Sequence, residues 1–418
     1  MLTTVACVWV GSRCVRGVKR STVGGLRVGL AVLGAATVLT ACTSEVTGSP
    51  VTAAGPPPGT VDIAGLDVGN YPTKPAPLGT AGTPEVGAIV EAQRMANYVT
   101  GPWEVDPALV VGYIRQPMVL IPRQVSVPIF KEIGRAAERH QFVNGFFVSR
   151  RSKDDTTFLH NAVLRFPDPG AAAAAVADIA KAAGDVQLPM QAGPPVPAPI
   201  PGHPDSVASS STHTNGPRTW ATVRSATPRG PYVLVQQVQS AGGVEATTAL
   251  VARTLDLQGP LIDKFRATAL AEFADLQIDP TGLLAKTLPI APKDATLIQR
   301  TVYERRGALH LQSDPVLSAA TFDRAGMDLL AYAKTNLYQG RDEAGAQLMA
   351  DAFVDELAAT STPADGVPNL PDSRCLALQQ GGHFCYAVAD RYLIEVNAMQ
   401  LADAHQRVSA QYAMLMAG

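Results

Sequence analysis

The sequence predicts an α+β protein made of two similar αβαββα halves packed together, in which antiparallel or mixed sheets are flanked by helices. Helical and strand patterns alternate from about residue 125 to the end of the chain. The steps Asp168-Pro169 and Asp314-Pro315 mark helix starts, because aspartate caps the first backbone N–H groups and proline fits the first turn. The same order of elements occurs twice, and Asp168 and Asp342 introduce the equivalent helix in each copy.

The first copy is preceded by one helix, expected over residues 84–99. The expected elements of the copy are a helix at 128–140, a strand at 157–166, an alanine-rich helix from 169, strands at 219–225 and 232–239, and a helix at 244–258 that breaks at Gly259-Pro260 and resumes through Phe273.

The second copy repeats this series. Its expected elements are a helix from Pro315, a strand at 327–338, a helix at 343–359, strands at 374–378 and 384–397, and a helix at 401–416. The copies differ in a long stretch of the first, Gly184 to Pro217, which is rich in proline, serine and threonine. A structureless stretch of this length inside a domain is either functional or disordered, and we interpret this one as a lid over a cleft.

The expected domain organisation follows from these patterns. It consists of a lipoprotein signal peptide at 1–41, a flexible Pro/Gly/Ser/Thr linker at 42–60, an N-terminal α+β domain at 61–290 that carries the long loop 184–217, and a C-terminal α+β domain at 291–418.

Residues 1–41 have the plan of a secretory signal. They contain five basic residues and no acidic residue, and the apolar run 28–39 follows the basic ones. As a helix this run would cover about 18 Å, too short for a hydrocarbon core of about 30 Å. Leu39-Thr40-Ala41-Cys42 resembles the bacterial lipobox, which implies diacylglyceryl transfer to Cys42 and cleavage before it. The alternative is ordinary signal cleavage beside a chance cysteine.

The charge of the exported chain limits its partners. Loss of residues 1–41 removes five of the 34 basic residues and none of the 36 acidic ones, which leaves a net charge of −7. An acidic chain without a basic cluster is a poor nucleic-acid binder, so we expect no nucleic-acid partner. Attachment to the extracytoplasmic face of the cell membrane is expected through the acyl chains on Cys42.

The remaining cysteines predict a disulfide. Cys7 and Cys14 leave with the signal, so Cys375 and Cys385 form an even pair in an oxidising compartment. The nine residues between them read as strand, glycine turn and strand, and cross-strand neighbours in a hairpin satisfy disulfide geometry. A metal site is the alternative, but it would need more ligands than the nearby His383.

No motif of the sequence specifies a reaction. The nucleophile elbow, the zinc-protease helix, the phosphate loop and the C-x-x-C pair are all absent, and the seven histidines lack metal-ligand spacing. We therefore expect no catalytic residue, no metal and no cofactor. Trp103, Trp220 and His203 are candidates for lining a ligand cleft; packing in the core is the alternative for both tryptophans.

Three stretches carry a family resemblance. LDVGNYPTKPAP, VEAQRMANYVTGPWEVDP and ADAHQRVSAQYAML, together with the lipobox, resemble a family of uncharacterised mycobacterial and nocardial lipoproteins with a domain of unknown function. The resemblance covers most of the exported chain. It implies a location in the cell envelope and transfers no functional residue beyond Cys42.

The expected function is non-catalytic binding of a ligand or a protein partner in the cell envelope. Two similar halves create an interface, and clefts form preferentially at interfaces. With 46% hydrophobic and 17% charged residues, a bulky and partly apolar ligand such as a lipid is expected. The alternative is an envelope hydrolase whose site is assembled from dispersed residues.

Overall fold

The computed structural model describes residues 61–113, 117–122, 131–185 and 191–417. The described residues all belong to one compact unit. Cys42 and the expected signal peptide lie outside the described residues, so the predicted lipid attachment stays a prediction. In the described part of the chain, no helix has both the length and the apolar character needed to cross a membrane.

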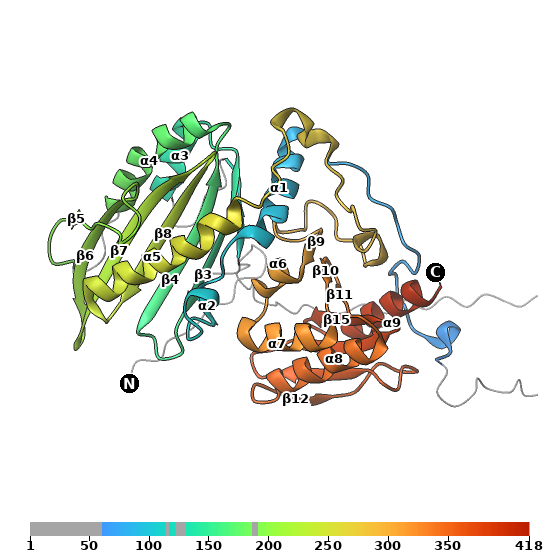
Figure 1. The fold of residues 1–418 in the computed structure, drawn as a ribbon. Helices are drawn as coiled ribbons and strands as arrows, with labels where there is room; N and C mark the ends of the chain where they lie inside the picture. Colours follow the sequence, from blue (N-terminus) through green and yellow to red (C-terminus); the bar gives the residue numbers. More distant parts are fainter. Residues whose placement is uncertain (1–60, 114–116, 123–130, 186–190, 418) are drawn as a thin grey trace, which may run out of the picture. The chain divides into compact units, whose positions relative to one another are not determined.

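The N-terminal half is built around an antiparallel sheet (Figure 1). Its strands, in spatial order, are β1 (Val111–Gly112), β3 (Asn144–Arg151), β4 (Thr157–Arg165), β8 (Tyr232–Ser240), β7 (Arg218–Arg229), β6 (Val207–Asn215) and β5 (Val196–Pro197), and β2 (Met118–Leu120) also pairs with β3.

Helices cover both faces of this sheet. Because side chains alternate along a strand, Phe147 and Val235 pack with helices α3 (Lys131–Arg139) and α4 (Pro169–Gly184). On the opposite face, Leu234 packs against Val251 of α5 (Gly243–Ile262). The predicted cap is present, since the Asp168 side chain accepts a hydrogen bond from the backbone N–H of Ala171. Helix α5 continues through Gly259-Pro260, where a break was expected, and ends at Ile262 instead of extending to Phe273.

The C-terminal half repeats this plan. Its antiparallel sheet has the order β12 (Ser361–Ala364), β13 (Arg374–Leu378), β14 (His383–Ala389), β15 (Tyr392–Ala398), β11 (Asn336–Gln339), β10 (Leu329–Tyr332) and β9 (Thr301–Glu304). Helices α7 (Pro315–Ala325) and α8 (Glu343–Leu357) lie on one face, and α9 (Leu401–Met416) lies on the other (Figure 1). The expected caps are present: Asp314 accepts from the N–H groups of Val316 and Leu317, and Asp342 from that of Gly345.

The predicted α+β class with two similar halves is confirmed. Strands β3-β4-β8-β7-β6 have the same spatial order as β10-β11-β15-β14-β13. The element order within each half needs correction, because the series is αββαββββα and not αβαββα. The expected strand at 327–338 is a tight hairpin of β10 and β11. Strand β3 was not predicted, because nearly all of its residues are buried and it therefore lacks the alternation of buried and exposed residues that marks a strand in a sequence.

The interpretation of residues 184–217 as a long structureless lid is wrong. Strand β6 lies within this stretch and pairs with β7 along its whole length, and β5 pairs with β6. The sequence VASSSTHTN has too few apolar residues to be recognised as a strand. Its serine and threonine residues nevertheless fit a strand when the backbone of β7 lies alongside and supplies the hydrogen bonds of the ladder. The hairpin turns at Gly216, which has a φ of 59°.

The remaining elements connect and extend the halves. They are η1 (Ile63–Gly65), α1 (Pro84–Met95), η2 (Ala96–Tyr98), α2 (Pro102–Val105), η3 (Leu270–Asp275), η4 (Leu284–Lys286) and α6 (Arg305–Leu309). Leu66 and its neighbours pack with the C-terminal half, where the Tyr71 hydroxyl donates to Asp403 on α9 at 2.6 Å.

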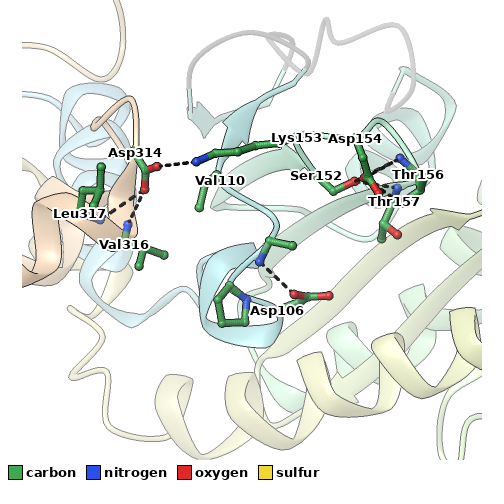
Figure 2. Close-up of a pocket in the computed structure, with 12 residues that line it drawn as sticks. Asp106, Val110, Ser152, Lys153, Asp154, Thr156, Thr157, Asp314, Val316 and Leu317 are labelled. Atoms are coloured by element: carbon green, nitrogen blue, oxygen red, sulfur yellow. Dashed lines mark hydrogen bonds and ion pairs between the residues drawn. The ribbon is translucent and has the colours of Figure 1, made fainter. Parts of the chain in front are cut away.

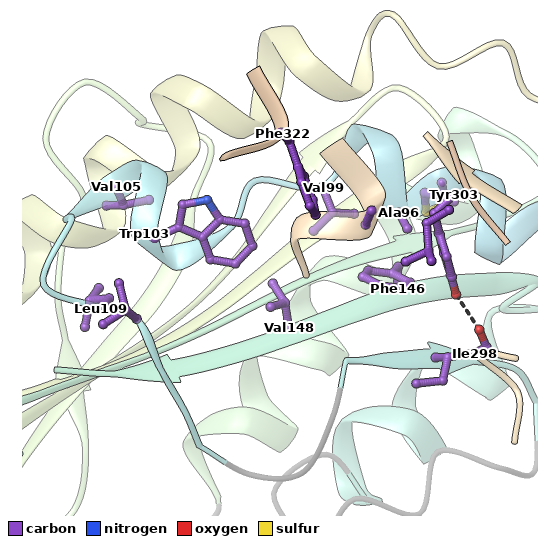
Figure 3. Packing of buried hydrophobic residues seen from close by; sticks show 14 of the residues in the cluster. Ala96, Val99, Trp103, Val105, Leu109, Phe146, Val148, Ile298, Tyr303 and Phe322 are labelled. Carbon is purple, nitrogen blue, oxygen red and sulfur yellow. Dashed lines mark hydrogen bonds between the residues drawn. The ribbon is translucent and has the colours of Figure 1, made fainter. Parts of the chain in front are cut away.

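One hydrophobic cluster draws on both halves (Figure 3). Phe146 of β3 and Trp103 of α2 belong to it together with Phe322 of α7 and Tyr303 of β9. The Tyr303 hydroxyl is buried and donates to the carbonyl oxygen of Ile298 at 2.8 Å, so this donor is satisfied inside the hydrophobic cluster. The halves therefore share a core rather than meeting through polar surfaces alone.

The predicted disulfide between Cys375 and Cys385 is present. The two residues face each other on β13 and β14, with 4.1 Å between their Cα atoms. His405 offers a third ligand atom within 4.8 Å of the sulfurs. Sulfurs joined in a disulfide are not thiolates and do not bind a metal as thiolates do, so we assign this group as a disulfide that crosslinks the two strands of the hairpin.

Candidate functional site

A polar cavity of about 540 Å³ opens on the C-terminal sheet, on the face that carries α8. This volume lies within the usual range of small-molecule sites. Its lining residues come from β10, β11 and the turn between them, from β14, β15 and α9, and from the loops before β9 and α7: Ile290, Gln299, Leu311, Gln312, Ser313, Tyr332, Ala333, Lys334, Asn336, Tyr338, Phe384, Glu395, Asn397 and Arg407.

Strand register creates a polar row across the floor of this cavity. Tyr332 pairs with Asn336, Asn336 with Glu395, and Glu395 with Tyr386, on the four adjacent strands β10, β11, β15 and β14. Directly paired residues point to the same face, with Cβ atoms about 5 Å apart. Tyr332, Asn336 and Glu395 are partly exposed, whereas Tyr386 is buried. The row therefore places a carboxylate, an amide and a phenol side by side where a ligand can reach them.

Glu395 is the most perturbed acid of the cavity. Burial is the main reason that its pKa is raised to about 7, and the charge of Glu356 on α8 acts in the same direction. Hydrogen bonds from Asn336, whose Nδ2 lies 2.6 Å from Oε1, and from Tyr338 partly oppose this rise in pKa. At neutral pH the group is near its midpoint, so a bound cation would shift it toward the carboxylate.

Basic groups lie at another part of the same cavity. Arg407 is already engaged by Asp403 at 2.5 Å and by the Tyr71 hydroxyl at 3.1 Å. The Lys334 ammonium lies 5.7 Å from the centre of the Tyr71 ring. Among the described residues, Lys334 has no carboxylate within ion-pair distance. The cavity thus offers one unpaired ammonium and one carboxyl group with a raised pKa.

The rim at Leu311–Ser313 is held by Arg150 of β3. The guanidinium donates to the carbonyl oxygens of four residues, Val110 (2.8 Å), His310 (2.9 Å), Gln312 (2.8 Å) and Ser313 (3.2 Å). It lies 5.5 Å from the Trp103 ring, and burial lowers its pKa to about 10. This buried arginine links the N-terminal sheet directly to the edge of the cavity.

A second cavity, of about 490 Å³, lies between the β3–β4 turn and the start of α7 (Figure 2). Lys153 reaches across it to Asp314, with 3.3 Å between Nζ and Oδ2. Asp106 and Asp154 point into local turns, where they accept from the N–H groups of Ala108 and Thr156. Its charged groups are committed to these contacts, so we assign the candidate site to the Glu395 cavity.

Comparison with known families identifies the chain. Residues 78–278 match the N-terminal domain of unknown function DUF7373, and residues 283–418 match the DUF7373 C-terminal domain. The chain belongs to the DUF7373 family. The match confirms the resemblance to a domain of unknown function, while the actinobacterial origin and the lipid anchor stay predictions.

Other comparisons add little to the DUF7373 assignment. No curated protein matches the chain. Among solved structures, the extracellular domain of PknH from Mycobacterium tuberculosis is 13% identical and aligns with a TM-score of 0.28. The alignment covers 40% of this chain and 94% of that domain.

The three residues that the sequence suggested for a cleft lie apart from the site of this DUF7373 protein. Trp103 is buried in the shared core, with its ring 5.2 Å from that of His310. Trp220 is also buried and stacks on His213, and His203 bonds Asp256 on α5 at 3.0 Å. None of these three residues lines either cavity described above.

Sequence reasoning missed the residues that line the cavity. Glu395 lies in the apolar strand YLIEVNA, and a charged residue on the buried face of a strand is an available signal. Nothing local marks Asn336 or Lys334, because their relation to Glu395 depends on pairing between strands distant in sequence.

Proposed function

We propose that this DUF7373 protein is a lipid-anchored, extracytoplasmic binding protein whose C-terminal half binds a small zwitterionic ligand, such as an amino acid or a short peptide. The observation that carries the proposal is that Glu395 and Lys334 both line one polar cavity without forming an ion pair with each other. A ligand ammonium would bind Glu395 and restore its charge, and a ligand carboxylate would bind Lys334.

The neighbouring groups suit such a ligand. Asn336 and Tyr332 supply hydrogen-bonding groups beside Glu395, and the Phe384 ring supplies an apolar wall. This lining favours a hydrophilic ligand over the bulky, partly apolar one that composition suggested.

A hydrolase is the second candidate function, and one observation favours it. A carboxyl group with a pKa of about 7 has the value that a general acid needs near neutral pH. Binding is the stronger proposal, because no activated nucleophile is evident among the residues that line the cavity.

The binding test uses the chain beginning after Cys42 and isothermal titration calorimetry with alanyl-alanine, maltose and a soluble envelope extract. We expect the dipeptide to bind and the neutral sugar not to. Glu395→Gln and Lys334→Met should each weaken binding at least about tenfold, the effect of one charge-assisted hydrogen bond. Lys293→Met, at an exposed position outside the cavity, is the matched control.

The outcomes separate the two candidates. Equal binding by the wild type and both cavity variants would refute the site. Turnover of ester, peptide or glycan substrates that disappears in Glu395→Gln would establish the hydrolase instead.

The anchor is tested separately on protein purified from the native membrane. Mass spectrometry should find diacylglyceryl-cysteine at Cys42 as the new N-terminus, and Cys42→Ala should release the protein from the membrane. An unmodified N-terminus at another residue would refute lipid anchoring without affecting the binding proposal.

A further inference from the structure

A second polar row crosses the N-terminal sheet, on the face that carries α4. Register aligns the residues of this row on the adjacent strands β3, β4, β8, β7 and β6: Ser149, His160, Gln237, Arg224 and Ser209. Thr222 and Ser211 face each other one step further along β7 and β6. Closer to α4 the same face is apolar, with Ala162, Val235 and Ala226 in its core.

Arg224 is a buried cation without an acidic partner among the described residues. The residue is 3% exposed, and its Nε donates to the Gln237 amide oxygen at 2.9 Å. Its buried Nη2 atom has no hydrogen-bond partner among the described residues. Burial alone lowers its pKa to about 10, and no carboxylate acts in the opposite direction.

Other buried polar atoms of this face also lack partners in the described part of the chain. They are both ring nitrogens of His160, the hydroxyls of Ser149, Thr222 and Ser211, and Nδ1 of His213. Burial, followed by the charge of Arg224, lowers the pKa of His160 to about 3, so its ring is neutral and keeps one N–H donor. A buried cation without a counter-charge, next to donors without acceptors, lowers the stability of the fold unless a bound ligand supplies the missing charge and acceptors.

We propose that Arg224, His160 and Ser149, with the hydroxyls of Thr222 and Ser211, form a binding site for an oxyanion, the phosphate or carboxylate group of a small ligand. Arginine matches the planar or tetrahedral oxygens of such a group, and hydroxyls and a neutral imidazole can donate to the remaining lone pairs. His213, two residues beyond Ser211 on the same face of β6, is partly exposed and continues the row toward the surface, which gives the anion an approach.

The alternative is a structural arginine solvated by buried water. The two explanations differ in the effect of Arg224→Met on the free protein. Replacing an uncompensated buried cation by an apolar side chain of similar length should leave the stability unchanged or higher. A structural arginine would instead lower the stability when removed.

The test measures thermal unfolding and calorimetric binding of the purified full-length protein in detergent micelles, with phosphate, acetate or chloride at equal ionic strength. We expect phosphate or acetate to raise the unfolding midpoint with saturation, and Arg224→Met to weaken this binding at least about tenfold. Arg218→Met, exposed on the same strand β7, is the matched control and should bind like the wild type.

The two anions identify the ligand group. A response to phosphate alone assigns a phosphate ligand, and a response to acetate assigns a carboxylate. The histidine side-chain NMR spectrum of the wild type, which should shift for the His160 ring on titration, provides a measurement that does not depend on a folded variant. Absence of any saturable anion effect, or an equal effect in Arg224→Met, would overturn the proposal.

Discussion

Replacing Glu395 by glutamine isolates the electrostatic cost of the carboxylate at the candidate site. Glutamine has the same shape, and its Oε1 can still accept hydrogen bonds from Asn336 and Tyr338. It cannot ionise. The variant therefore removes the titration of one group and leaves the packing of the sheet in place.

The sign and the size of the effect follow from the pKa of Glu395. This pKa is about 7 in the folded protein and 4.5 as the reference value. A carboxyl group with a higher pKa in the folded state stabilises the fold fully below about pH 4.5, and this contribution is lost as the pH rises through about 7. The rise in pKa corresponds to about 3 kcal/mol of unfolding free energy. The stability of the wild type should thus fall relative to that of the variant between pH 4.5 and pH 7.5.

Urea denaturation of both proteins at pH 4.5, 6 and 7.5 measures this difference. We expect the unfolding free energies of wild type and Glu395→Gln to converge or cross, changing by about 3 kcal/mol relative to each other. Glu272→Gln, at an exposed glutamate, should follow the wild type at every pH. Parallel pH dependence of wild type and Glu395→Gln would show that Glu395 is solvated like a surface acid.

Three further predictions concern stability. Arg150→Met leaves buried carbonyl oxygens without their donor and should lower the unfolding free energy by about 3 kcal/mol or more; a loss below 1 kcal/mol would contradict the link described for Arg150. Replacing Cys375 and Cys385 by serine opens a loop of ten-residue separation and should cost about 2.5–3 kcal/mol in urea without reductant, and little difference from the wild type would argue against the bond. Gly87→Ala should destabilise by about 1–3 kcal/mol, because its Cβ would lie 2.1 Å from a carbonyl oxygen of η3, whereas Gly79→Ala meets no atom within 4 Å; equal thermal midpoints would refute the close approach.

Local interactions explain what the sequence by itself determined. Asp168, Asp314 and Asp342 were recognisable as caps, because an aspartate bonds N–H groups two or three residues away whatever the rest of the fold does. The disulfide between Cys375 and Cys385 could be predicted for a similar reason, because one short hairpin brings the two residues opposite each other. Together with the repeated order of elements, these local signals sufficed for the α+β class and the two halves.

Tertiary structure decided the features that depend on a distant partner strand. The polar stretch 207–215 becomes β6 only because β7 offers it hydrogen bonds along its full length. Glu395 meets Asn336 through the register of β15 with β11, across 59 residues of sequence. Likewise, none of the described strands places an acidic residue opposite Arg224, and no local sequence pattern could predict this. Burial and cross-strand register, which no sequence window contains, thus create both candidate sites.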